Sequence, residues 1–470
     1  METEHKKFDL IIIGSGPGGY ASAILSAQKG LSVALIEKRD LGGTCLNRGC
    51  IPTKTLLHEA SLWSLFNQSG MIRNREEVHS YFKKTMEKKD LAIRQVVSGL
   101  QNLLAREQIT LFRGEASFHN PTLVIVKRDG EVIDRLEGTQ ILIASGAVPK
   151  EIETSKRDGQ WIIGSDDLLR LEEIPSSLAI IGGGRRGVEF ATFFTHFGVP
   201  VTLIERENRI LPKMDREISV RYKGILTKNR VKVFTETEVL STEVLEKNRS
   251  ILLTLNQKGK KETVKVEKVL VVAERKGDVE GLNLTHAEVA LKGDFISVDP
   301  FMKTSMPNIY AVGDVVGRGF YAHKAFYEGR VAIDNIVGKE SQVNYRVIPI
   351  CLYGHPEASS VGMTEEEALN QYGEVQVGKF PFMACGRAIA EGNQEGMVKI
   401  ISEKKYGEVL GLHILGPMAT ELVHLGVMAM KHEIGVEDLK ELIFAHPTFS
   451  EAFFEAGLDT YGEALHMMKG

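Results

Sequence analysis

Cysteine is rare in this sequence. Four cysteines among 470 residues are too few for disulfide bonds to stabilise a fold of this size. This scarcity indicates a reducing compartment, and we expect a cytoplasmic location. Any chemistry that the cysteines carry must therefore be local. Long apolar runs are missing as well, since no stretch approaches the roughly 18 residues that a membrane span needs. Residues 8–13 are apolar apart from Asp9 and lead into a glycine motif, so they predict a buried strand and not a signal peptide.

An excess of charge of either sign is also missing. The 62 acidic and 58 basic residues leave a net charge of −4, which argues against nucleic-acid binding and against a basic membrane-surface protein. The chain is 43% hydrophobic and 26% charged, as an ordinary globular protein is, and it has no low-complexity segment. Its length suggests roughly three domains. Glycine, with 46 copies, is enriched.

Two glycine-rich turns belong to an internal repeat. In each copy a short apolar strand leads into a GxGxxG turn that opens a helix, and a second strand ends in a glutamate. The second copy follows the first at a constant offset of 168 positions, from 14 to 182 and from 37 to 205. The matching residues are Gly14, Gly16, Gly19 and Glu37 in the first copy, and Gly182, Gly184, Gly187 and Glu205 in the second.

Two such copies predict two dinucleotide sites. The glycines let backbone N–H groups approach a pyrophosphate at the N-terminus of a helix, and the acid accepts hydrogen bonds from a ribose hydroxyl. A single GxGxxG would be weak evidence, whereas two copies in the same strand and helix context are strong evidence. We therefore expect one dinucleotide in each of two domains.

The rest of the chain predicts further strands and helices, and one change in the pattern of secondary structure. A polar stretch at 150–160 marks a boundary, and from about Tyr345 the pattern changes to that of an α+β domain. The fold class is therefore predicted as α/β, with two Rossmann-like dinucleotide-binding domains and a C-terminal α+β domain. We expect strands at 109–117, 122–128, 141–144, 269–273, 309–312, 375–382, 397–401 and 409–415, and helices at 75–108, after 419, after 437 and at 451–467.

The stretch from Gly42 to Lys54 reads GGTCLNRGCIPTK. Its two cysteines, Cys45 and Cys50, stand five positions apart at the start of an expected helix, whose positive end favours a reactive thiolate. The alternatives are two structural cysteines or half of a metal site, but there are too few soft ligands for zinc. We favour a redox pair and expect no metal.

This stretch resembles the redox-disulfide motif of the pyridine nucleotide–disulfide oxidoreductases. Within that family it is most similar to the dihydrolipoyl dehydrogenases, which reoxidise dihydrolipoyl groups. The resemblance covers nearly the whole chain and includes residues 304–314, which end in Tyr-Ala-Val-Gly-Asp, and residues 445–451, Ala-His-Pro-Thr-Phe-Ser-Glu. The glutathione reductases share the glycine and disulfide motifs but tend to differ around the cysteines and just after the histidine.

The resemblance implies a catalytic set. Cys45 would face the substrate and Cys50 the flavin, as a disulfide. His446 would be the acid–base group, with Glu451 orienting its imidazole, because each step of thiol–disulfide exchange moves a proton with the sulfur. The alternative for His446 is a capping or core histidine. In the family this histidine reaches the disulfide of the other subunit, so a homodimer is implied.

The resemblance also implies FAD and NAD as cofactors. It assigns FAD binding to residues 1–150, with the redox disulfide, and to 276–344, NAD binding to 151–275, and dimerisation to 345–470. Lys54 and Glu189 match positions beside the reactive edge of the flavin; the alternative is an ordinary surface pair. The implied partner is a lipoyl-carrying protein or a small disulfide substrate. Further implied cofactor contacts are Gly43, Thr44, Ser145, Gly146, Arg275, Asp314 and Ala322.

Three positions depart from the family pattern. Arg186 replaces an apolar residue and follows Arg185, the segment 274–278 differs from the usual Gly-Arg-x-Pro-Asn, and Phe444 replaces a second histidine. The arginine pair either adds positive charge near a pyrophosphate, or Arg186 narrows access for the nicotinamide so that NAD turnover is impaired.

Two alternative functions stay open, and the arginine pair is the feature that keeps the second of them open. One is a different disulfide reductase of the glutathione type, and the other is a flavin-bearing docking or electron-relay component. For the nicotinamide, Glu205 favours NAD because its charge repels the 2′-phosphate of NADP. A small rotation of the nearby Arg206 or Arg209 would instead present a cation to that phosphate.

Overall fold

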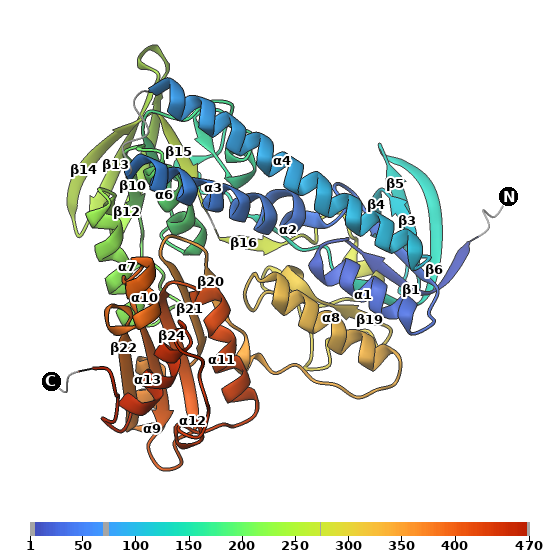
Figure 1. Ribbon diagram of the computed structural model, residues 1–470. Coiled ribbons are helices and arrows are strands. Elements are labelled where there is room, and N and C mark those ends of the chain that lie inside the picture. Colours follow the sequence, from blue (N-terminus) through green and yellow to red (C-terminus); the bar gives the residue numbers. More distant parts are fainter. Residues whose placement is uncertain (1–4, 69–74, 273, 468–470) are drawn as a thin grey trace. The chain divides into compact units, whose positions relative to one another are not determined.

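The computed structural model describes residues 5–68, 75–272 and 274–467 (Figure 1). The chain divides into two compact units. The first contains the described residues within Met1–Leu56, Lys84–Glu151 and Ala273–Asn344. The second contains those within Leu57–Lys83, Ile152–Val272 and Tyr345–Gly470. Among the described residues, no helix is long and apolar enough to cross a membrane.

The first unit is built on a mixed sheet with the strand order β3-β2-β1-β6-β5-β4, and β19 lies beside β6. The strands β1, β2, β3, β6 and β19 pair in parallel, and β4 and β5 add an antiparallel edge. The bounds are β1 (Lys6–Ile13), β2 (Val33–Glu37), β3 (Thr110–Arg113), β4 (Glu115–Phe118), β5 (Leu123–Arg128), β6 (Glu131–Ile143) and β19 (Ile309–Ala311).

Both faces of this sheet are covered. Along β1, Leu10 and Ile12 belong to one apolar cluster, whereas Ile11 and Ile13 belong to another, as the period of two in a strand requires. The helices α1 (Pro17–Gln28) and α8 (Ala322–Ile336) pack side by side (Figure 1). The redox segment adds α2 (Gly43–Arg48) and α3 (Cys50–Gln68), and α4 (Arg75–Arg106) follows; α3 and α4 have residues in both units.

The second unit begins with a parallel sheet of order β11-β10-β9-β15-β8, which carries the second glycine turn. The helices α6 (Arg185–His196) and α7 (Arg216–Lys228) follow β9 and β10 in the chain. The strands are β8 (Ile162–Ile163), β9 (Leu178–Ile181), β10 (Val201–Ile204), β11 (Lys232–Phe234) and β15 (Lys268–Val271). An antiparallel sheet of β12 (Thr237–Leu245), β13 (Ser250–Gln257) and β14 (Lys260–Val266) is inserted before β15.

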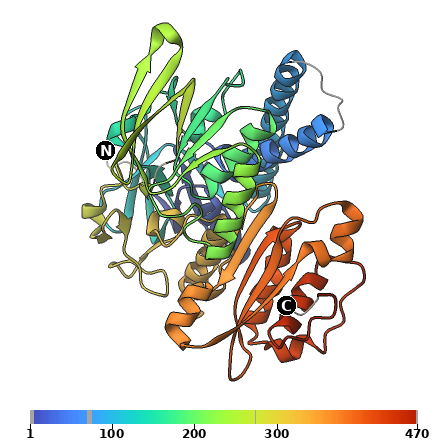
Figure 2. The same cartoon turned by 90° about the vertical axis from the view of Figure 1, so that its left-hand side faces the viewer.

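The C-terminal part of this unit is an antiparallel sheet of order β20-β21-β24-β23-β22 with helices on one face (Figure 2). The helix α11 (Ala419–Lys431) packs on β21 and β24, and α13 (Glu451–Asp459) packs on β22 and β23. Both helices bury side chains in the same apolar cluster. The strands are β20 (Ile350–Leu352), β21 (Glu357–Gly362), β22 (Val375–Pro381), β23 (Met397–Glu403) and β24 (Val409–Gly416), and the short helices are α9 (Glu365–Tyr372), α10 (Gly386–Glu391) and α12 (Val436–Leu439).

Three of the expected elements are wrong in extent. The expected strand at 109–117 is two strands, β3 and β4, divided by a bend at Gly114. A Cβ at this position would lie 2.5 Å from the carbonyl oxygen of Lys127, so the bend needs glycine. The expected helix at 451–467 ends at Asp459, since Gly462 takes a left-handed φ of 69° and buried Glu455 accepts the amide of Leu465 at 2.8 Å. The strand expected at 269–273 ends at Val271, and residue 273 lies outside the described residues.

The sheet of β12–β14 was not expected from the sequence. Its signal was present, because Lys258 and Gly259 form a two-residue turn between β13 and β14 and both have positive φ, 51° and 85°. Such a turn joins two antiparallel strands. On β13, Ile251, Leu253 and Leu255 are fully buried and point to one face.

Candidate active site

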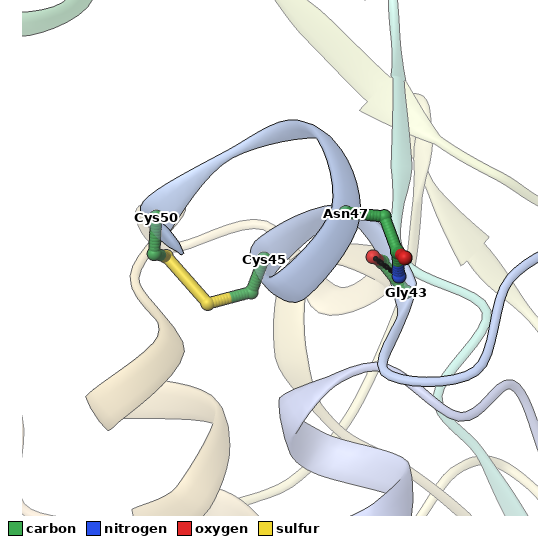
Figure 3. The surroundings of a disulfide bond; sticks show 4 residues. All are labelled: Gly43, Cys45, Asn47 and Cys50. Carbon is green, nitrogen blue, oxygen red and sulfur yellow. Dashed lines mark hydrogen bonds between the residues drawn. A yellow bond between two sulfur atoms is a disulfide. The ribbon is translucent and has the colours of Figure 1, made fainter. Parts of the chain in front are cut away.

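The two cysteines of the CxxxxC motif are joined as a disulfide (Figure 3). Cys45 lies in α2 and Cys50 is the first residue of α3, with 4.8 Å between their Cα atoms, a separation within the normal range. Asn47 holds the segment in shape, because its Nδ2 donates to the carbonyl oxygens of Leu41 and Gly43 at 2.9 Å. The predicted pairing is therefore present within the first unit.

The disulfide segment lies directly on the first glycine turn. Gly43 has a φ of 60°, and a Cβ there would lie 2.7 Å from the Cα of Gly16. Gly42, with a φ of 89°, caps the helix that carries Cys45. Because this contact needs two residues without side chains, the glycines on both sides hold the redox pair beside whatever the turn binds.

The first turn fits a dinucleotide. A Cβ at Gly19 would lie 1.8 Å from the carbonyl oxygen of Gly14, so the helix packs closely against the strand, whereas a Cβ at Gly16 would meet open space. The backbone of Gly16 is thus the part that a pyrophosphate can approach. Beside it, the buried hydroxyl of Ser145 has no hydrogen-bond partner in the described part of the chain, and Gly146, with a φ of 84°, faces open space. These are the properties of a site built for a ligand.

Glu37, the last residue of β2, accepts hydrogen bonds from the first glycine turn. The Oε2 of Glu37 accepts hydrogen bonds from the amide of Ser15 at 2.9 Å and from its hydroxyl at 2.6 Å. The Oε1 accepts from the amide of Arg39 at 2.7 Å. Glu37 is 7% exposed. A carboxylate has about four acceptor positions, so it retains room for a ribose hydroxyl.

The second turn repeats this geometry at the same offset. The Oε2 of Glu205 accepts from the amide of Gly183 at 2.7 Å, and its Oε1 accepts from the amide of Glu207 at 2.8 Å. A Cβ at Gly187 would lie 1.8 Å from the carbonyl oxygen of Gly182, and one at Gly184 would meet open space. The internal repeat is therefore a repeat of hydrogen bonds as well as of sequence, and the second turn fits a second dinucleotide.

Several expected cofactor contacts lie in the first unit. Asp314 lies in a short helical turn, Gly313–Val316, directly after β19, and Ala322 is the first residue of α8. Arg275 lies in a two-stranded ribbon and donates from Nη2 to the carbonyl oxygen of Ala147 at 2.6 Å. The remaining two, Thr44 and Lys54, lie in α2 and α3.

Glu189 lies in the second unit and is 2% exposed. Its Oε1 accepts the amide of Tyr353 at 3.0 Å, just after β20. Arg185, one turn earlier on α6, donates from Nη1 to the carbonyl oxygen of Cys351 at 2.9 Å. Burial, with smaller contributions from Cys351 and Glu189, raises the pKa of Tyr353 to about 12. The sequence singled out Arg185 but not this partner, because nothing local links residue 185 to residue 351.

His446 and Glu451 form a hydrogen-bonded pair in the second unit. The Nδ1 of His446 lies 2.8 Å from the Oε1 of Glu451, and the amide of Thr448 donates to Oε2 at 2.7 Å. A carboxylate can only accept, so Nδ1 carries the proton and Nε2 is the basic nitrogen of the neutral ring. The side chain of His446 is 73% exposed, which leaves the ring accessible to a reacting group.

Phe444, which replaces a second histidine, packs on α13. Its ring centroid lies 5.3 Å from that of Phe454 and 6.4 Å from that of Phe453. It therefore anchors the segment that carries His446. Within the described ranges, no group of three or more His, Cys, Asp or Glu side chains is placed to hold a metal ion.

Comparison with known proteins places the chain in a family. A family model described as pyridine nucleotide-disulphide oxidoreductase matches residues 8–329, and its dimerisation domain matches residues 348–456. A dihydrolipoyl dehydrogenase of Bacillus subtilis is 38% identical over 461 residues, which are 97% of this chain and 99% of the relative. Mitochondrial dihydrolipoyl dehydrogenase 2 of Arabidopsis thaliana is 36% identical over 466 residues, 98% of this chain and 91% of the relative.

Solved structures agree with this placement. The Cu(II) complex of the HOCl-induced flavoprotein disulfide reductase RclA from Escherichia coli has a TM-score of 0.85 and 29% identity, and the match covers 96% of this chain and 99% of that one. LpdA from Mycobacterium tuberculosis has a TM-score of 0.87, with the same coverage, and at 23% identity it supports the fold alone. The predicted fold class and family resemblance are confirmed. The chain belongs to the pyridine nucleotide-disulphide oxidoreductase family, and it is a flavoprotein oxidoreductase that uses FAD and NAD.

Proposed function

We propose that this protein is an NAD-dependent dihydrolipoyl dehydrogenase that oxidises protein-bound dihydrolipoyl groups. The observation that carries the proposal is the Cys45–Cys50 disulfide held against the first glycine turn. The relatives named dihydrolipoyl dehydrogenase, which match almost the whole chain, support the choice of substrate. The scarcity of cysteine supports a cytoplasmic location.

In the proposed reaction, one thiolate of the substrate attacks the Sγ of Cys45. The bond between Cys45 and Cys50 breaks, Cys50 takes the electron pair, and a mixed disulfide forms between the substrate and Cys45. The second substrate thiol gives its proton to Nε2 of His446 and attacks the substrate sulfur bonded to Cys45. Cys45 then leaves as a thiolate and the oxidised substrate departs as a disulfide. When bound, FAD and NAD supply the path by which the dithiol's two electrons leave as hydride.

His446 is the proposed acid–base group. Glu451 fixes the Nδ1–H tautomer and the direction of the ring. Histidine is suited to this role because it can accept and release a proton near neutral pH. We propose that the protein is a homodimer in which His446 of the partner subunit serves each disulfide. The matched dimerisation domain supports a dimer, and a two-fold axis makes the exchange reciprocal.

We assign the parts of the chain to the cofactors as follows. Residues 1–150 and 276–344 bind FAD, residues 151–275 bind NAD, and residues 345–470 form the dimer interface. Gly182, Gly184, Gly187 and Glu205 would hold NAD, and Lys54 and Glu189 would lie beside the reactive edge of the flavin. The contacts proposed for FAD are Gly14, Gly16, Gly19, Glu37, Gly43, Thr44, Ser145, Gly146, Arg275, Asp314 and Ala322.

A second candidate is a reductase of a different disulfide. The 29% identity to a flavoprotein disulfide reductase favours it, because that relative shares the fold and most of the chain length. In this case the protein would draw electrons from NADH or NADPH and would not oxidise dihydrolipoyl groups.

Steady-state turnover separates the two candidates. Purified holoprotein is given dihydrolipoamide with NAD⁺, and separately NADH or NADPH with lipoamide, glutathione disulfide or another disulfide. Rapid dihydrolipoamide oxidation with NAD⁺ supports the proposal. Turnover of another disulfide without lipoamide activity would favour the second candidate. Reduction by dihydrolipoamide without turnover of any nicotinamide would identify an electron-relay component instead.

A further inference from the structure

Two charged residues of α8 are completely buried. Lys324 and Glu328 lie one turn apart, and both side chains are 0% exposed. The Nζ of Lys324 lies 2.9 Å from Oε1 and 3.0 Å from Oε2 of Glu328. Removing two charges from water is energetically unfavourable, so a pair in this position needs further hydrogen bonds.

Three such hydrogen bonds join the pair to one turn. Lys324 donates to the carbonyl oxygens of Gly313 at 3.2 Å and of Gly317 at 3.1 Å. Glu328 accepts the amide of Gly313 through Oε2 at 2.7 Å. The pair thus binds both ends of residues 313–317, the segment that contains Asp314.

The same helix is packed against the first glycine turn. A Cβ at Gly329, next to Glu328, would lie 2.5 Å from the hydroxyl oxygen of Ser22 and 3.3 Å from the carbonyl oxygen of Gly18. Gly18 and Ser22 belong to α1, which opens with that glycine turn. α8 therefore connects the turn that receives the pyrophosphate to the turn that contains Asp314.

We propose that Lys324 and Glu328 are positioning residues for FAD. They hold the turn of residues 313–317 so that Asp314 is fixed relative to the first glycine turn, and they act on FAD through Asp314. A buried ion pair is often no more stabilising than apolar residues of similar volume. The function of the pair is accordingly to set the affinity for FAD, and not to stabilise the fold.

The test replaces both charges together. In Lys324→Met/Glu328→Leu no charge is left buried and unpaired, so we expect the unfolding midpoint of the deflavinated protein to stay within a few degrees of wild type. The dissociation constant for FAD, measured by quenching of flavin fluorescence on titration, should rise at least tenfold. The control is Lys339→Met, which removes the exposed partner of Asp334 at the end of the same helix and should leave the constant unchanged.

A mutant cycle that combines Lys324→Met/Glu328→Leu with Asp314→Asn tests whether the pair acts on FAD through Asp314. If the pair acts through Asp314, the triple variant binds FAD no more than about twofold more weakly than the weaker of its two parents. If the two losses of FAD affinity multiply in the triple variant, the pair acts independently of Asp314 and the proposal is overturned. An FAD constant within twofold of wild type in Lys324→Met/Glu328→Leu also overturns it. Should that variant fail to fold, Lys324→Gln/Glu328→Gln, which leaves no buried charge and keeps an acceptor for Gly313, must weaken FAD binding while the midpoint of the deflavinated protein stays within a few degrees of wild type, or the proposal fails.

Discussion

Arg185 donates a hydrogen bond to the carbonyl oxygen of Cys351, 166 positions later in the chain. Glu189, on the same face of α6, accepts the amide of Tyr353. The two side chains hold two points of a single short segment, so the first turn of α6 is bound to the strand β20. From the sequence, Arg185 is expected only to add positive charge near a pyrophosphate, together with Arg186, and that role does not involve this contact.

The two hydrogen bonds from Arg185 and Glu189 to residues 351 and 353 predict an effect on nicotinamide binding. In the proposed function the first turn of α6 would present the backbone of Gly184 to NAD, and the hydrogen bond from Arg185 to Cys351 would hold that turn in place. Arg185→Met should raise the KM for NAD⁺ roughly tenfold, since a hydrogen bond from a charged group contributes about 1.5–3 kcal/mol. Reduction of the holoprotein by dihydrolipoamide, followed by stopped-flow absorbance, should keep its wild-type rate.

Arg185→Lys is the matched variant, because it keeps the charge and one donor. It should recover part of the loss in NAD⁺ binding. If the KM for NAD⁺ is unchanged in Arg185→Met, the hydrogen bond from Arg185 to Cys351 has no role at the nicotinamide site. If the dihydrolipoamide half-reaction slows as well, the effect is a general loss of structure.

The choice between NAD and NADP follows from a second contact. Arg209 donates from Nη2 to the Oε2 of Glu366 at 3.1 Å, so α9 holds this arginine by its terminal nitrogens. With Glu205 in place, NADH should have a lower KM than NADPH. Glu366→Gln releases Arg209 and should narrow the preference by up to about fivefold, the scale of an exposed ion pair. A lower KM for NADPH in the wild type would contradict this.

Acid should destabilise the second unit through His196. Burial, with a further contribution from His355, lowers the pKa of His196 to about 4, against about 6.5 in an unfolded chain. Between these values the unfolded chain binds a proton and the folded chain does not, so stability is lost as the pH falls from 6.5 to 4. The loss is on the order of 3 kcal/mol, from about 1.4 kcal/mol for each pH unit.

Thermal unfolding at several pH values checks this expectation. His196→Gln cannot titrate, so its unfolding midpoint should vary less than that of wild type between pH 4 and 6.5. The control is His432→Gln, at an exposed position after α11, which should follow the wild-type curve. Equal pH dependence in wild type and His196→Gln would show that this histidine is not the source.

The disulfide should be needed for turnover and not for the fold. Cys45→Ser and Cys50→Ser should each abolish dihydrolipoamide oxidation by NAD⁺, because no disulfide remains to accept the substrate electrons. FAD should stay bound, as judged by the absorbance of the purified protein. Cys385→Ser is the control, since a hydroxyl can still donate to the carbonyl oxygen of Thr448 as the thiol does. Wild-type turnover in either variant of the pair would make the motif structural.

The sequence predicted those parts of the molecule that depend on local pattern. The repeat is one of them: Gly14 and Gly182 each donate to the end of a neighbouring strand at 2.8 Å, at Ile36 and Ile204. Apart from the turn at Lys258 and Gly259, which is a local signal, the parts it missed depend on tertiary packing. Lys324 reads as one more surface lysine, because its burial comes from the turn at 313–317 and from helix packing.

The last expectation concerns how the active site is shared. The proposal gives each site the disulfide of one chain and His446 of the partner subunit. Cys45→Ser and His446→Gln should each be inactive alone. After subunit exchange, a mixed dimer has one site with both defects and one with neither, so its activity should return to about half that of wild type. The measurement is dihydrolipoamide oxidation before and after exchange.

The control mixes Cys45→Ser with Cys50→Ser, which leaves every disulfide broken and should restore nothing. If each chain completes its own site, both sites of the Cys45→Ser and His446→Gln dimer are defective and no activity returns. A wild-type protein that is active and monomeric by light scattering would rule out sharing without any mixing. Recovery confined to the first mixture would place Cys45 and His446 of one site on different subunits, because only that arrangement leaves an intact site.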